Sequence, residues 1–113
     1  MAQDIRAYLK NADISAQKAR LVVDLVRGKK AVDAANMLKY TPKKAARILE
    51  KLLGSAIANA EENFGVSRDD LVVYQITADE APTRKWRRFG ARGRFKPLLR
   101  RSSHLTIVLR ERE

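Results

Sequence analysis

The sequence predicts an α+β fold in which a small three-stranded antiparallel sheet packs on three helices and a long β-hairpin projects from the sheet. Three observations support this prediction. Apolar residues recur with helical spacing between residues 15 and 63, and they alternate with polar residues before and after that region. Residues 81–110 contain ten Arg or Lys side chains and no Asp or Glu. Such a segment cannot neutralise its own charge, so it needs an outside polyanion.

The length of the chain, 113 residues, gives room for one domain and a modest core. Hydrophobic residues make up 45% of it and aromatic residues only 6%, which indicates a largely aliphatic core. We expect a single domain over residues 1–113, with a globular part formed by residues 1–80 and 102–113. Residues 81–101 are expected to form the extended basic hairpin.

The sequence carries no sign of export, membrane insertion or disulfide bonding. It contains no Cys, so neither a disulfide framework nor a thiolate metal site is possible. Its first ten residues lack the apolar run of a signal peptide, and no stretch approaches the roughly 18 apolar residues that span a bilayer. We therefore expect a soluble cytoplasmic protein with no membrane partner.

The first two expected elements are a short strand and a helix. Residues 5–10 alternate apolar and polar side chains, which predicts a strand with one basic face. Ser15 then suits the N-cap of a helix that Gly28 can end. The inward face of this helix is expected to consist of Ala19, Val22, Val23 and Val26.

Two further helices are expected before residue 65. The shorter repeats the same spacing at Ala31, Ala34, Ala35 and Leu38. The longer is expected to begin at Thr41-Pro42, with Thr41 as its N-cap, and to run to about Asn63. Its inward stripe is predicted to be Ala45, Ile48, Leu49, Leu52, Ala56 and Ala60. Gly54 lowers helix propensity, so we expect another element to approach the backbone closely there.

Two more strands are predicted at residues 71–79 and 104–110, which are rich in β-branched and aromatic residues. Pairing Leu71 with Arg110 places the centre of the connecting hairpin near Gly90-Ala91, within a GARG run that can make a tight turn. Each arm between strand and tip then holds about ten residues and reaches roughly 35 Å.

The hairpin combines cations with aromatic rings. Its seven Arg and two Lys residues are Arg84, Lys85, Arg87, Arg88, Arg92, Arg94, Lys96, Arg100 and Arg101. An Arg guanidinium holds a phosphate through two hydrogen bonds, and Trp86, Phe89 and Phe95 offer flat faces to unstacked bases. A disordered basic tail and a membrane-surface segment are the alternatives. We favour nucleic acid, because the chain returns to a well-formed strand afterwards and the segment lacks a helical moment.

Cations on the globular part are less diagnostic. Lys43, Lys44, Arg47 and Lys51 lie on the long helix, where a solvated outer face is the favoured explanation. The SAQKAR segment differs, because Ser15, Lys18 and Arg20 lie near a helix N-terminus and can bring a hydroxyl, free N–H groups and cations to one phosphate. A nucleic-acid contact and a purely structural role remain equally open for it.

Nothing in the sequence indicates catalysis, a metal site or a cofactor. His104 is the only histidine and has no carboxylate near it in sequence, so we interpret it as a hydrogen-bonding strand residue. Asn59 and Asn63, one helical turn apart, either face RNA or cap the helix end. The chain lacks a phosphate-binding glycine loop, a dinucleotide fingerprint and a nucleophile elbow. We therefore expect no enzyme and no small-molecule substrate.

Five segments occur in a characteristic order and spacing: ISAQKARLVVDLVRGK, SAIANAEENFG, DEAPTRK, GARGR and RRSSHLTIVL. Together they resemble the bacterial form of the ribosomal protein L-twenty-two family, a universal large-subunit family, from Arg6 to Leu109. The resemblance implies a structural constituent of the large ribosomal subunit that binds its ribosomal RNA and supports early assembly. It also implies that the hairpin tip forms part of the wall of the nascent-peptide exit tunnel.

The resemblance also assigns residues and partners. The implied partners are large-subunit ribosomal RNA, neighbouring large-subunit ribosomal proteins and, at the tip, the nascent peptide. The resemblance and the arguments from charge, aromatic rings and the helix start together give the expected rRNA-binding residues. These are Ser15, Lys18, Arg20, Arg27, Lys29, Asn59, Arg84, Lys85, Trp86, Arg87, Arg94, Lys96, Arg100, Arg101, Ser103 and His104. The expected tunnel-lining tip consists of Arg88, Phe89, Gly90, Ala91, Arg92 and Gly93.

The chain departs from the family pattern at Ala81, Gly90 and Phe95, and its tip is bulkier. From the residues alone, the competing interpretation is an architectural nucleic-acid-binding protein outside the ribosome, which would use the arm as DNA-bending ribbons do.

Overall fold

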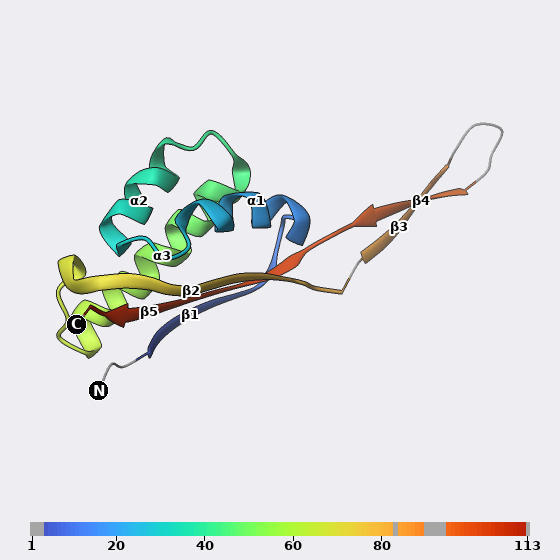
Figure 1. Ribbon diagram of the computed structural model, residues 1–113. Helices are drawn as coiled ribbons and strands as arrows, with labels where there is room; N and C mark the ends of the chain where they lie inside the picture. The colour runs from blue at the N-terminus through green and yellow to red at the C-terminus, as the bar shows by residue number, and fades with distance from the viewer. Residues whose placement is uncertain (1–3, 83, 90–94, 113) are drawn as a thin grey trace.

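The computed structural model describes residues 4–82, 84–89 and 95–112, and for residues 84–89 and 95–100 it describes the backbone (Figure 1). The elements follow one another as β1 (Asp4–Ala12), α1 (Ala16–Val26), α2 (Ala31–Tyr40), α3 (Lys44–Asn63), the one-turn 3-10 helix η1 (Arg68–Asp70), β2 (Leu71–Glu80), β3 (Arg84–Phe89), β4 (Phe95–Arg100) and β5 (Ser103–Glu111). The predicted strands and helices are all present.

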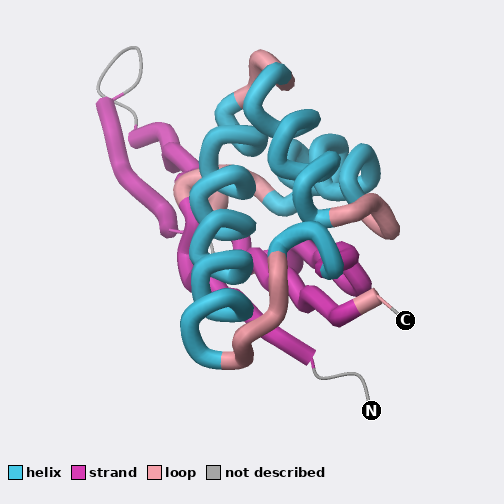
Figure 2. The backbone as a smooth tube through the Cα atoms, turned by 90° about the vertical axis from the view of Figure 1, so that its left-hand side faces the viewer, coloured by secondary structure: helices cyan, strands magenta, loops and turns pink. Residues whose placement is uncertain are grey.

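The sheet contains three antiparallel strands in the order β1-β5-β2, so the last strand of the chain lies between the first and the second. The three helices cover one face of this sheet, as Figures 1 and 2 show. The predicted α+β class is confirmed. In β5, Leu105, Ile107 and Leu109 are buried beneath the helices as predicted, but Val108 between the last two is buried as well, so the alternation is interrupted there.

The hairpin extends the β2 and β5 strands away from the globular part (Figure 1). β3 and β4 pair antiparallel from Arg84 opposite Arg100 to Phe89 opposite Phe95. The molecule is 63 Å long but only 24 and 19 Å across in its other two directions. The projecting ribbon that the sequence predicts is therefore present. Residues 90–94, which join β3 to β4, lie outside the described residues.

The predicted register was wrong by one residue. Arg110 pairs with Val72, and Leu71 pairs with Glu111. A β-bulge between Val73 and Gln75 shifts the pairing again further along β2. Bulges insert a residue into one strand only, so a register extrapolated from a single pair drifts toward the tip.

The helical core agrees with the periodicity, but the long helix buries more than predicted. Val22, Val23 and Val26 of α1 are fully buried. On α3, Ile48 is only partly buried, whereas the additional residues Ala46, Leu53 and Ile57 belong to the core. The stripe is wider because α3 packs against α2 on one side and against β1 and β5 on the other.

Thr41 does not cap α3, as the sequence had led us to expect. It is the C-cap of α2, and its Oγ1 donates a hydrogen bond to the carbonyl oxygen of Met37 at 2.6 Å. The N-cap of α3 is Lys43, which makes no side-chain capping bond. A Thr hydroxyl can serve either a following N–H or a carbonyl four residues back, and here it serves the earlier helix.

The expected close approach at Gly54 is also wrong. Gly54 is exposed, and an added Cβ there would meet no atom within 4 Å. Its lack of a side chain therefore leaves open surface on α3 rather than room for another part of the chain.

At the end of the sheet remote from the hairpin, an ion pair joins β1 to β5. The Arg110 guanidinium donates hydrogen bonds to both carboxylate oxygens of Asp4, on the neighbouring strand. It also lies 3.4 Å above the centroid of the Tyr74 ring. The hydrogen bond from Arg110 lowers the pKa of Asp4, and the same contact raises the pKa of Arg110.

Candidate nucleic-acid interface

The N-terminus of α1 has the geometry that its sequence predicts. Ser15 is the N-cap, and its Oγ accepts a hydrogen bond from the backbone N–H of Lys18 at 3.4 Å. The first-turn N–H groups of Ala16 and Gln17 have no carbonyl partner within the helix, as at every helix start. The positive end of α1 is therefore available to an anion.

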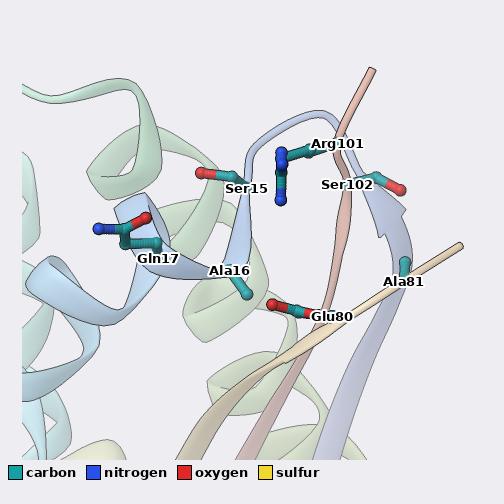
Figure 3. Close-up of a pocket in the computed structure, with 7 residues that line it drawn as sticks. All are labelled: Ser15, Ala16, Gln17, Glu80, Ala81, Arg101 and Ser102. Carbon is teal, nitrogen blue, oxygen red and sulfur yellow. The ribbon is translucent and has the colours of Figure 1, made fainter. Parts of the chain in front are cut away.

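This helix start faces the root of the hairpin. Figure 3 shows a hollow formed where the beginning of α1 meets the end of β2 and the segment leading into β5. Its lining residues are Ser15, Ala16, Gln17, Glu80, Ala81, Arg101 and Ser102. The guanidinium of Arg101 reaches toward Ser15 (Figure 3). Sheet pairing thus brings a cation from the far end of the sequence to the first helix.

An adjoining hollow of about 470 Å³ continues along the same surface. Lys18, Lys44 and Arg101 line it, together with Asp13, Ile14, Ser15 and Gln17. The Lys44 ammonium lies 3.2 Å from a carboxylate oxygen of Asp13. The ion pairs among the described residues include neither Lys18 nor Arg101, and both side chains are exposed. We define these cations, Lys18, Lys44 and Arg101, as the root cluster.

Two of the predicted RNA-binding arginines also have a structural role. Nε of Arg20 donates a hydrogen bond to the carbonyl of Ala78 at 3.1 Å, and Nη2 of Arg27 donates to the carbonyl of Ile76 at the same distance. Arg27 also pairs with Asp24 at 2.7 Å. Both arginines therefore tie α1 to the outer edge of β2, and they lie away from the Ser15 hollow that we expected Arg20 to join.

The other predicted residues of the globular part are dispersed. Lys29 is exposed between α1 and α2. Asn59 is partly buried on α3, and its Oδ1 accepts a hydrogen bond from Asn63. Neither residue lines the hollows at the hairpin root.

The Ser103 side chain is buried, and the His104 side chain makes a hydrogen bond within the protein. Ser103 is fully buried, and its Oγ has no hydrogen-bond partner among the described residues, so this side chain is absent from the surface. Nδ1 of His104 accepts a hydrogen bond from the backbone N–H of Asn11 at 3.1 Å. The interpretation of His104 as a hydrogen-bonding strand residue is confirmed.

The hairpin places like charges opposite one another. Its register pairs Arg84 with Arg100 and Arg88 with Lys96. Like charges at directly opposite positions destabilise an antiparallel pair. Two such pairs on one short ribbon favour an anion that neutralises them. Of the expected tip residues, Arg88 and Phe89 end β3, and residues 90–93 lie outside the described part of the chain.

One member of the root cluster, Lys44, is not among the residues that the sequence predicts to bind RNA. A cation in the first turn of a helix is electrostatically unfavourable, and the ion pair of Lys44 with Asp13 offsets part of this cost. Lys44 is the first residue of α3, and Lys43 is the N-cap of that helix. Gln17, which lines both hollows, was not predicted either.

Among the described residues, no group of three or more His, Cys, Asp or Glu side chains is arranged to hold a metal ion. In the same part of the chain, no helix combines the length and the apolar character needed to cross a bilayer.

A comparison of the sequence with known protein families gives a match. The model of the family described as Ribosomal protein L22p/L17e matches residues 7–110, almost the whole chain. The resemblance carried by the α1 motif and by the segment leading into β5 is thereby confirmed. The chain belongs to the Ribosomal protein L22p/L17e family, a family of structural, non-enzymatic proteins of the large ribosomal subunit.

Proposed function

We propose that this protein binds large-subunit ribosomal RNA through two connected surfaces, the root cluster and the hairpin. By doing so it supports early assembly of the subunit in the cytoplasm. The hairpin tip, residues 88–93, then forms part of the wall of the peptide exit tunnel and touches the nascent chain.

The observation that carries the proposal is the continuity of positive charge from α1 to the hairpin. Lys18 and Arg101 lie at the root. The like-charge pairs of β3 and β4 begin at Arg100, the residue next to Arg101. An RNA strand that follows this path neutralises both sets of charges, and it releases counterions as it does so.

At the root, a phosphate fits the available groups. Arg101 offers a planar fork of donors, and Lys18 offers a mobile ammonium. The free N–H groups at the start of α1 add the positive end of a helix dipole. Glu80 and Asp13 also line these hollows, so the phosphate is expected beside Lys18 and Arg101 rather than at the Glu80 end.

Co-sedimentation with ribosomal subunits tests the proposal. The protein should remain with large subunits, and not with small subunits, through a high-salt wash. The double variant Lys18→Ala and Arg101→Ala should be released at lower salt, because fewer phosphates are then neutralised by the protein. Arg68→Ala is a matched control, because Arg68 is an exposed cation of η1 that is already paired with Glu61 at 2.8 Å.

Equal retention of the double variant and the Arg68 control would contradict a phosphate-binding role for the root cluster. Release of the wild-type protein from large subunits in the wash would contradict the proposed function as a whole.

A further inference from the structure

The two edges of the sheet differ in how their backbone is covered. The edge formed by β2 is occupied. The N–H of Gly28 donates to the carbonyl of Val73 at 3.1 Å, and the N–H of Val73 donates to the carbonyl of Lys29 at 2.9 Å. Arg20 and Arg27 cover two more carbonyls of this strand. Loops and side chains of the protein therefore cover part of the β2 edge.

The opposite edge, formed by β1, is open. β1 pairs with β5 on one side only. Among the described residues, no loop or side chain makes a hydrogen bond to the backbone of residues 5–9 on its outer side. Such an edge is a row of unpaired N–H and C=O groups that can pair with another extended chain.

A groove lies along this open edge, between β1 and α3. It has a volume of about 640 Å³. Its lining residues are Arg6, Ala7, Tyr8, Leu9, Ile48, Lys51, Leu52, Ser55 and Asn59. Ala7, Leu9 and Ile48 are partly buried and pack against the core, so the floor is apolar.

A groove between an edge strand and a helix is the geometry that accepts an extended peptide as an added strand. Main-chain hydrogen bonds then come from the edge, and alternate side chains enter the groove. We infer that the β1–α3 groove binds an extended segment of another protein, in which apolar residues alternate with acidic ones.

The positive charges along the groove favour a partner with acidic side chains. Arg6 and Lys51 line it, Lys10 is exposed on the same strand, and none of its nine lining residues is a carboxylate. A second copy of this chain is a poor occupant, because antiparallel pairing of two β1 edges would bring these cations together. RNA also fits less well, because an alternating row of backbone donors and acceptors matches a peptide and the floor offers few polar groups to a base edge.

This inference goes beyond the proposed function and does not rest on it, since neither the root cluster nor the hairpin contributes to the groove. A failure of peptide binding would leave RNA binding untouched, and the reverse also holds.

The test uses the full-length protein labelled with nitrogen-15 and a capped heptapeptide in which Val alternates with Glu. At millimolar peptide, the amide resonances of residues 5–9 and 48–59 should shift, and amide exchange along β1 should slow. The same peptide with Lys in place of Glu should bind more weakly. N-methylation of alternate peptide bonds in the register that faces β1 should abolish the shifts.

A matched pair of variants locates the site. Ser55→Tyr fills the groove from an exposed helical position and should weaken peptide binding by about tenfold, because the ring takes the space of one peptide side chain. Ala58→Tyr adds the same bulk at an exposed position of α3 outside the groove and should leave the affinity unchanged. Absence of shifts, equal effects of the two variants, or shifts in the groove with an RNA oligonucleotide but not with the peptide would each overturn the inference.

Discussion

Nε of Arg20 lies 3.1 Å from the carbonyl oxygen of Ala78, so a predicted RNA-binding cation is also a structural tie. Ala78 belongs to β2, which lies at one edge of the three-stranded sheet. The hydrogen bond from Arg20 satisfies a carbonyl group that would otherwise be unpaired at the edge of the sheet. Among the described residues the Lys18 side chain makes no such tie, so stability and the proposed RNA contact are separable along α1.

This relationship predicts opposite behaviour for two neighbouring cations. Arg20→Met should lower the free energy of unfolding by about 1–2 kcal/mol, since it removes a charge-assisted hydrogen bond from a partly buried carbonyl. Lys18→Met should change it by less than about 0.5 kcal/mol, as is usual for an exposed side chain. Urea denaturation measures both. A Lys18 variant as unstable as the Arg20 variant would refute the distinction.

The periodicity of the sequence predicted the helices and strands, but it did not predict which residues come together at the candidate site. Local rules predicted Ser15 as a cap and Val22 and Val23 as core, because both depend on residues close in sequence. The meeting of Lys18 with Arg101 depends on the pairing of β2 with β5, and no local pattern encodes it. The prediction that Ser103 binds RNA overlooked a pattern in the sequence. On an alternating strand, Ser103 lies on the same face as the buried residues Leu105, Ile107 and Leu109.

Stability should fall in acid through the ion pair of Asp4 and Arg110. The hydrogen bond from Arg110 lowers the pKa of Asp4 below its ordinary 3.8. A carboxyl with a lowered folded-state pKa stabilises the protein above its unfolded-state pKa, and this contribution is lost as the pH falls through the folded-state value. Asp4→Asn should therefore flatten the loss of stability below about pH 3.8.

Urea midpoints measured across that acidic range provide the check. Glu62→Gln is the control, because Glu62 is exposed on α3 and makes no ion pair among the described residues. An acid limb as steep in Asp4→Asn as in the wild-type protein would show that the pair does not contribute.

The start of α3 should be improvable. Lys43 occupies its N-cap with an extended backbone, φ −133° and ψ 146°, and provides no side-chain acceptor. Lys43→Asp should raise the free energy of unfolding by about 1 kcal/mol, because a carboxylate caps the free N–H groups and complements the helix dipole. Lys51→Asp, in the middle of the same helix, should bring no gain. If thermal unfolding shows equal shifts for both, capping is not the cause.

The hairpin tip is expected to serve the tunnel rather than assembly. Deletion of residues 89–93 should leave large-subunit assembly intact, since the arms and the root cluster supply the proposed anchoring charges. It should change nascent-chain stalling or macrolide sensitivity. Sucrose-gradient profiles and a stalling reporter measure the two effects. A block in assembly would make the tip a structural anchor and would exclude the proposed division of roles.

The central claim, that RNA phosphates neutralise the hairpin, is tested most directly by the salt dependence of RNA binding. The logarithm of the affinity for large-subunit RNA should fall linearly with the logarithm of the salt concentration. Changing Arg84, Arg87, Arg88, Arg92 and Arg94 together to Ala should reduce that slope by roughly 0.7–0.9 for each phosphate that the protein no longer neutralises. A weaker affinity with a shallower slope is the predicted result, and an unchanged slope would show that these side chains do not neutralise phosphates.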